Sequence, residues 1–159
     1  MIRYVVLFLG LASSVRAQPS ADMPGWKSSL TREGVEWKPA GLPADRLFTY
    51  TLFFPTPARG IPAADLKVFA YADIVRWGVV SQPLSLGKSE TVLTFSGAVR
   101  DRGKSRIVTY LAFRAGRENR FARVLSEPDE KLYLPYLAEV GRHFGRLTRT
   151  SLPSVYIPK

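Results

Sequence analysis

Cationic side chains are concentrated between residues 100 and 123, where eight arginines and lysines face only two acidic residues. The planar guanidinium group of arginine pairs well with phosphate and carboxylate oxygens, so this stretch predicts binding of an anionic polymer or lipid head group. The anion-binding candidates are Arg100, Arg102 and Lys104 in one group and Arg114, Arg117 and Arg120 in another. The sequence leaves open the alternative that charged turns only keep a sheet soluble and discourage edge pairing.

The chain has one histidine, His143, and no cysteine. Disulfides, thiolate metal sites and a cysteine nucleophile are therefore excluded, and no histidine pair has zinc-ligand spacing. We expect His143, between Arg142 and Phe144, on the solvated basic side of a helix. We predict no catalytic residue, no metal and no cofactor.

Three carboxylates, Glu127, Asp129 and Glu130, cluster before the last predicted helix. Two carboxyl groups at a suitable separation are enough for glycoside hydrolysis, which keeps a small hydrolase of an envelope polymer as the alternative function. Acidic residues at this position also favour the positive end of a helix, and we interpret the cluster as a solvated cap.

The two cationic groups are placed by three predicted strands, at 91–100, 105–114 and 120–126. Short glycine-containing turns at 101–104 and 115–119 make these strands an antiparallel meander, which puts the groups at opposite ends of it. Aromatic residues also interleave with the charges, as in nucleic-acid stacking platforms, but strand alternation assigns most of them to the core. Nucleic acid is therefore a disfavoured partner.

The rest of the chain predicts an α+β domain, with helices packed on an antiparallel sheet. Period-2 alternation predicts a half-buried strand at 46–54, and three- and four-residue spacing predicts a helix at 62–77. We expect a polar loop at 81–88 and a final helix that starts near Pro135, since proline disrupts a helix interior. A short hairpin is predicted from the runs Trp26–Leu30 and Val35–Trp37.

One set of apolar residues is predicted to be buried together as the core. The set is Phe48, Tyr50, Leu52, Leu66, Phe69, Trp77, Leu111, Phe113, Leu137, Val140 and Phe144.

The first residues predict export. A basic start, an apolar run and the small residues around Ala17 have the order of a cleavable signal peptide, which we place at 1–17. The apolar run is about half the ~20 residues of a membrane-spanning helix, so we expect no transmembrane anchor after cleavage. A leader at 18–25, one α+β domain at 26–150 and a tail at 151–159 would follow, in a chain with a formal net charge of +10.

The meander Arg106–Ser126 and the helix that ends in Val140-Gly141-Arg142-His143-Phe144 resemble, in layout, the C-terminal half of PsbP-like domains. The segment Gly25–Leu52 resembles small uncharacterised secreted proteins of proteobacteria. The PsbP-like resemblance covers about residues 46–148 without a specific motif, so no functional residue is carried over. It implies an antiparallel sheet between helices and an accessory role without catalysis.

Together these features predict a periplasmic or secreted accessory domain of the cell envelope. Its expected partner is an anionic envelope polymer, a lipid surface or another protein.

Overall fold

The computed structural model describes residues 23–57, 63–88, 92–115 and 118–148. The predicted signal peptide 1–17 and the predicted tail 151–159 lie outside these residues. One antiparallel sheet forms the centre of the domain, with strand order β1-β2-β3-β8-β7-β6-β5, and the short β4 also pairs with β8. The strands are β1 Trp26–Leu30, β2 Gly34–Pro39, β3 Phe48–Phe53, β4 Thr56–Pro57, β5 Val79–Lys88, β6 Val92–Asp101, β7 Lys104–Ala115 and β8 Glu118–Ser126.

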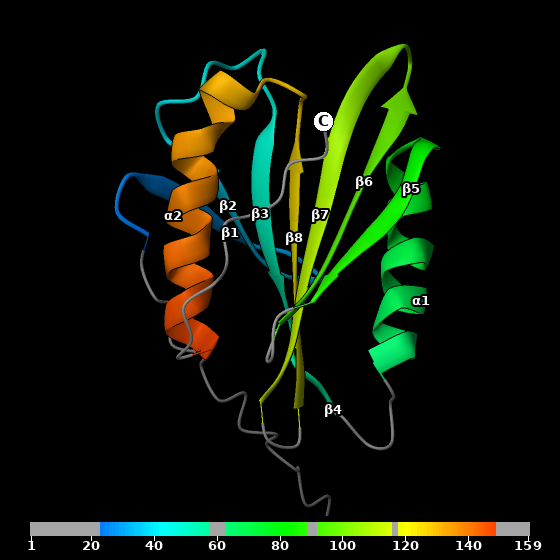
Figure 1. Ribbon diagram of the computed structural model, residues 1–159. Coiled ribbons are helices and arrows are strands. Elements are labelled where there is room, and N and C mark those ends of the chain that lie inside the picture. Colours follow the sequence, from blue (N-terminus) through cyan, green and yellow to red (C-terminus); the bar gives the residue numbers. More distant parts are fainter. Residues whose placement is uncertain (1–22, 58–62, 89–91, 116–117, 149–159) are drawn as a thin grey trace, which may run out of the picture.

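Helices lie on both sides of this sheet (Figure 1). Helix α1, Ala63–Ile74, continues into the 3-10 turn η1, Val75–Trp77, on one side. Helix α2, Glu130–Thr148, lies on the other side. The prediction of an α+β domain with two main helices flanking an antiparallel sheet therefore agrees with the architecture.

The predicted meander is present as β6, β7 and β8, in continuous antiparallel register. Only Arg102 and Gly103 separate β6 from β7, with φ values of 48° and 80°. Two consecutive positive φ angles make a tight turn whose twist matches that of the flanking strands. Glycine adopts this conformation without steric cost, whereas Arg102 adopts it against its preference.

Strand β3 is buried along its whole length, and the expectation that it is half-buried was wrong. Its two faces contribute to different cores because a helix covers each side of the sheet. Phe48 and Tyr50 belong to the core under α2. Phe53 belongs to the core under α1, together with Ala70 and Ile74.

The predicted single core is thus divided by the sheet into two. Most of the predicted core residues are buried, namely Phe48, Tyr50, Leu52, Leu111, Phe113, Leu137, Val140 and Phe144. Phe69 is an exception at 43% exposure, and Trp77 is partly buried against the α1 core. The predicted core residue Leu66 has a side chain outside the described part of the structure.

Residues 81–88, predicted to be a loop, belong to the edge strand β5. The strand pairs only with β6, and its register shifts between Val80 and Gln82 and again between Gln82 and Ser85. An edge strand tolerates Pro83 and polar side chains because one side of its backbone needs no ladder partner. These features hide the two-residue alternation by which a strand is recognised in the sequence.

Helix α2 begins at Glu130, five residues before the predicted start at Pro135. Asp129 caps it, because the backbone N–H of Leu132 donates to Asp129 Oδ1 at 3.2 Å. Pro135 lies inside the helix and forfeits one backbone hydrogen bond. Buried Tyr133 and Leu137 on either side of Pro135 hold both turns against the sheet, which offsets that loss.

Candidate anion-binding site

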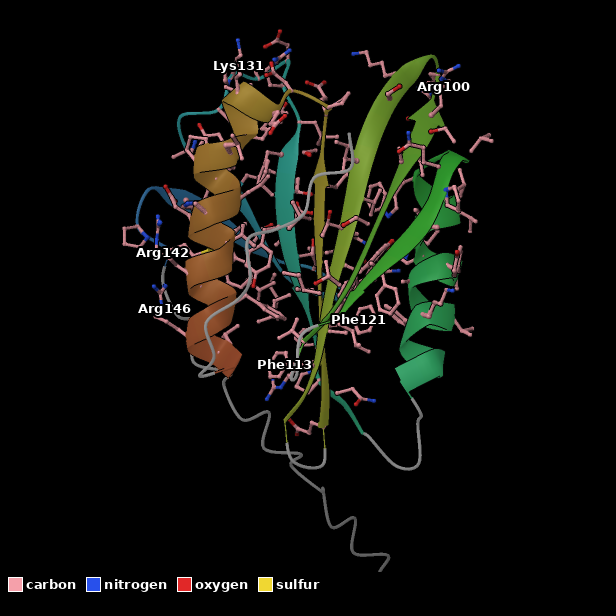
Figure 2. The ribbon with its side chains drawn as sticks, in the orientation of Figure 1. Arg100, Phe113, Phe121, Lys131, Arg142 and Arg146 are labelled. Carbon is pink, nitrogen blue, oxygen red and sulfur yellow. The ribbon has the colours of Figure 1, made fainter. Side chains whose placement is uncertain are left out.

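The first predicted cationic group lies at the tip of the β6–β7 hairpin. Arg100, Arg102 and Lys104 are all exposed, at the end of β6, in the turn and at the start of β7. The two other charged residues here neutralise each other, since Arg106 Nη2 lies 2.9 Å from Asp101 Oδ2. In Figure 2, Arg100 lies beside this tip, at the opposite side of the view from Arg142 and Arg146 on α2. Three positive charges therefore share one turn.

The second predicted group, at the β7–β8 turn, is only partly described. Arg120 is partly buried and pairs with Glu118 at 2.9 Å. The side chain of Arg114 and the whole of Arg117 lie outside the described residues. The structure therefore describes three exposed cations at the first tip and one ion-paired cation at the second.

Arg123, from the same cationic stretch, has a structural role that the sequence analysis missed. Its side chain is 3% exposed, and Nη1 donates to both carboxylate oxygens of Asp73, at 3.0 and 2.9 Å. The guanidinium also lies over the ring of Trp77, 4.4 Å from the centroid. Strand alternation could have revealed this role, because it places Arg123 on the same face as Phe121 and Leu125.

Asp73 is the centre of this buried network between α1 and the sheet. Tyr110 Oη donates to Asp73 Oδ2 at 2.6 Å, and Trp77 Nε1 donates to the same oxygen at 3.2 Å. Arg76 pairs with Asp73 and also with Glu33 from the β1–β2 turn. The carboxylates of Asp73 and Glu33 balance the guanidinium groups of Arg76 and Arg123. This network therefore has no surplus charge for a ligand.

His143 is buried, and the expectation that it is solvated was wrong. The side chain is 1% exposed, its Nδ1 lies 3.1 Å from Tyr50 Oη, and its ring packs 5.2 Å from that of Trp37. Val140, His143 and Phe144 share the three- and four-residue spacing of one helix face. That spacing was the available signal, and it was overlooked because His143 has a basic neighbour.

Buried tyrosines make the stability of the domain sensitive to alkaline pH. Burial raises the pKa of Tyr50 and Tyr110, and the hydrogen bond to Asp73 raises the pKa of Tyr110 further. Both tyrosines titrate near pH 10 in the unfolded chain but at higher pH in the folded one, so stability is retained below pH ~10 and lost above it.

We expect the free energy of unfolding to fall above pH ~10, by up to about 1.4 kcal/mol per pH unit for each such tyrosine, and the urea midpoint to fall with it. Urea unfolding at a series of pH values measures this, and Tyr50→Phe should make the fall shallower. A midpoint that is unchanged between neutral pH and pH ~11 would contradict the prediction.

The acidic cluster at the start of α2 has structural partners. Asp129 caps the helix and pairs with Arg46, which also lies 3.7 Å from Glu127 Oε2. Tyr133 Oη donates to Glu127 at 3.0 Å, and burial together with this bond raises the pKa of Tyr133 to about 12. The interpretation of the cluster as a helix cap is confirmed for Asp129, and Glu130 remains exposed.

The described residues contain neither a metal-ligand cluster nor a helix that could span a membrane. Within residues 23–57, 63–88, 92–115 and 118–148, no group of three or more acidic or histidine side chains is arranged to hold a metal ion. Over the same residues, no helix has the length and apolar character needed to cross a bilayer.

The fold is an α+β type, an antiparallel sheet with a helix on each face, and a similar fold is found among solved structures. No protein-family model and no curated protein matches the chain. LpqN of Mycobacterium tuberculosis, described as involved in cell envelope biogenesis, has a similar structure, with a TM-score of 0.52 and 16% sequence identity. The match covers 79% of this chain and 83% of LpqN, and at this identity it shows the fold alone.

A second similar chain is the Pseudomonas aeruginosa protein PA94, of unknown function and described as a putative regulator. Its TM-score is 0.39 at 10% identity, with 84% of this chain and 97% of that chain covered. Neither structure is described as a PsbP-like protein, so the resemblance to that family stays a prediction.

Proposed function

We propose that this protein is an exported accessory domain of the cell envelope, which binds a phosphate-bearing anionic surface without catalysis. The observation that carries the proposal is the β6–β7 tip, where Arg100, Arg102 and Lys104 are exposed together. The predicted signal peptide supports the compartment, and the fold shared with LpqN, a protein of envelope biogenesis, is consistent with it.

The physical basis is the gain from placing three cations at an anionic surface. Each Lys or Arg near such a surface contributes about 1 kcal/mol at physiological ionic strength. Three contribute about 3 kcal/mol, roughly a hundredfold in affinity. A hairpin tip suits this role because it lies at one end of the sheet with its cationic side chains exposed.

The experiment is co-sedimentation with vesicles of equimolar phosphatidylcholine and phosphatidylglycerol. Binding should be strong at 0.01 M salt and weak at 0.15 M, because the Debye length shortens from ~30 Å to ~8 Å. A phosphate-rich envelope polymer in place of vesicles distinguishes a polymer from a lipid as the source of phosphate.

Two triple variants with equal loss of charge test the location. Arg100→Ser, Arg102→Asn and Lys104→Ser remove the tip cations, with asparagine at position 102 because it tolerates positive φ. Lys131→Ser, Arg142→Ser and Arg146→Ser remove three exposed cations from α2 as the control. We expect the first variant to lose binding about a hundredfold and the second to retain most of it.

Exposed substitutions usually change stability by less than ~0.5 kcal/mol, so both variants should fold. A third variant at Arg114, Arg117 and Arg120 tests the other predicted tip. Equal loss of binding in the tip and α2 variants would show that only net charge matters. Wild type that stays in the supernatant with both vesicles and polymer would show that the tip charges only solubilise the sheet.

A further inference from the structure

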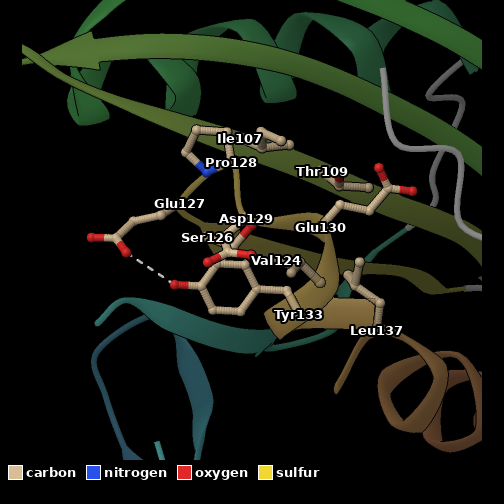
Figure 3. A pocket seen from close by; sticks show the side chains of 10 residues that line it. All are labelled: Ile107, Thr109, Val124, Ser126, Glu127, Pro128, Asp129, Glu130, Tyr133 and Leu137. Atoms are coloured by element: carbon tan, nitrogen blue, oxygen red, sulfur yellow. Dashed lines mark hydrogen bonds between the residues drawn. The ribbon is translucent and has the colours of Figure 1, made fainter. Parts of the chain in front are cut away.

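A pocket opens between the first turns of α2 and the sheet strands β7 and β8 (Figure 3). It is separate from the cationic tip, although both lie on β7. The residues that line it are Ile107, Thr109, Val124, Ser126, Glu127, Pro128, Asp129, Glu130, Tyr133 and Leu137.

The interior of the pocket is narrow, mainly aliphatic and contains two hydroxyl groups. Val124 and Leu137 contribute apolar side chains that are 3% and 8% exposed. Thr109 is hydrogen-bonded to Ser96 at 3.1 Å. Ser126, 5% exposed, lines the pocket, and its hydroxyl makes no hydrogen bond to another described residue. A hydroxyl that lines a pocket can donate to or accept from a polar atom of a ligand or a water.

The mouth of the pocket is acidic, in contrast to the basic chain as a whole. Glu127, Asp129 and Glu130 supply three carboxylates, and no lysine or arginine is among the described residues that line the pocket. Arg46 compensates one of these charges, and the positive end of α2 compensates about half of another, which leaves about −1.5. Glu127 and Glu130 extend to opposite sides of the mouth in Figure 3, and Glu130 has no ion-pair partner among the described residues.

We propose that this pocket binds a primary alkylammonium group, with the ammonium at the acidic mouth beside Glu130 and the adjoining methylene groups against the aliphatic side chains. This aliphatic stem replaces water against Val124, Leu137 and Ile107, which is favourable because these side chains are apolar. The ammonium donates hydrogen bonds, and the pocket offers carboxylate and hydroxyl acceptors. An anionic ligand would instead meet three carboxylates.

The inference goes beyond the proposed function, since it concerns a different surface and a ligand of opposite charge. The ammonium has two natural sources, a small free diamine or the lysine side chain of a larger partner. Both present a primary ammonium at the end of a chain of methylene groups, and the probes below separate them.

The experiment is amide chemical-shift perturbation by NMR on the full mature chain, with three probes of one stem length. 1,5-Diaminopentane has the proposed head group, 1-pentanol lacks the charge, and pentanoate reverses it. We expect the diamine to shift amides of β7 near Thr109, of the β8–α2 junction and of the first turns of α2. Affinity should fall as salt rises, pentanol should bind at least about fivefold more weakly, and pentanoate should leave the spectrum unchanged.

Two variants locate the interaction. Glu130→Gln removes the unpaired carboxylate, and we expect at least a fivefold loss of diamine affinity with the pentanol shifts unchanged. Glu118→Gln removes an exposed carboxylate at the far end of β8 and should leave diamine affinity unchanged. Ile107→Phe narrows the pocket and should weaken binding of both the diamine and pentanol. If this variant folds poorly, the two glutamine variants decide the test.

A further probe distinguishes the two sources of the ammonium group. Nα-acetyl-lysine amide that binds as the diamine does would support a lysine side chain as the ligand, and binding of the diamine alone would support a small molecule. The proposal is overturned if the diamine shifts nothing, if pentanol binds equally well, or if Glu118→Gln costs as much as Glu130→Gln. The tip variant should lose vesicle binding and keep its affinity for the diamine, because the two sites lie on different surfaces. Failure of one proposal is therefore distinguishable from failure of the other.

Discussion

Replacement of Arg123 by methionine is expected to lower the free energy of unfolding by about 3–5 kcal/mol. The variant leaves Asp73 as a buried carboxylate, 5% exposed, without the guanidinium that holds both of its oxygens. Tyr110 and Trp77 still donate to Asp73, but neither carries a positive charge. Arg76 still lies 3.2 Å from Asp73 Oδ1, but its side chain is 58% exposed and water screens this ion pair. Urea unfolding followed by far-UV circular dichroism measures the change.

Arg120→Met is the matched control, on the same strand and three residues away. Its ion pair with Glu118 is at the surface, and such pairs contribute only about 0–1 kcal/mol. Equal unfolding midpoints for the Arg120 and Arg123 variants would contradict the prediction.

A double variant separates the contribution of the ion pair to stability from the contribution of packing. Asp73→Leu combined with Arg123→Met removes both charges, and its cost should be smaller than the sum of the two single costs. The native pair is already imperfect, since Arg123 Nε has no hydrogen-bond partner among the described residues. Additive costs would show that the two residues contribute to stability through packing and not through their charges.

The parts of this fold that were predictable from the sequence are those set by local periodicity. The three-stranded meander has two-residue alternation and a tight turn at Arg102-Gly103, and both signals are contained within a few residues. The burial of Leu137, Val140 and Phe144 follows in the same way from helical spacing.

The errors occurred where tertiary structure overrides local preference. Strand β5 is built on Pro83 and polar residues because β6 provides the ladder partner. Helix α2 continues through Pro135 because the residues around it are buried against the sheet. The division of the core also depends on which helix covers which face, and the sequence pattern does not contain that information.

The two candidate sites also differ in how far the sequence alone could predict them. The tip cations Arg100, Arg102 and Lys104 lie within five consecutive residues, so a hairpin prediction is enough to bring them together. The pocket combines residues from β7, β8 and α2, and it exists only after α2 is extended back to Glu130. With α2 started at Pro135, Glu130 and Tyr133 would lie in a loop, and no pocket could be inferred.

The position of α2 depends on Phe144, and Phe144→Ala is expected to lower the free energy of unfolding by about 3–5 kcal/mol. The side chain is 0% exposed, and its ring meets Phe113 of β7 edge-to-face at a centroid distance of 5.2 Å. Alanine would leave a cavity between the helix and the sheet, because β7 is fixed by β6 and β8 on either side. Chemical denaturation monitored by tryptophan fluorescence gives the midpoint.

Leu134→Ala on the same helix is the control, since Leu134 is 47% exposed and its truncation should cost less than about 0.5 kcal/mol. The same helix provides Tyr133 and Leu137 to the amine pocket, so loosened packing of α2 should also weaken diamine binding in the Phe144 variant. An unfolding midpoint equal to that of the Leu134 variant would mean that another face of α2 meets the sheet. In that case both the buried position of His143 beside Tyr50 and the pocket geometry would have to be revised.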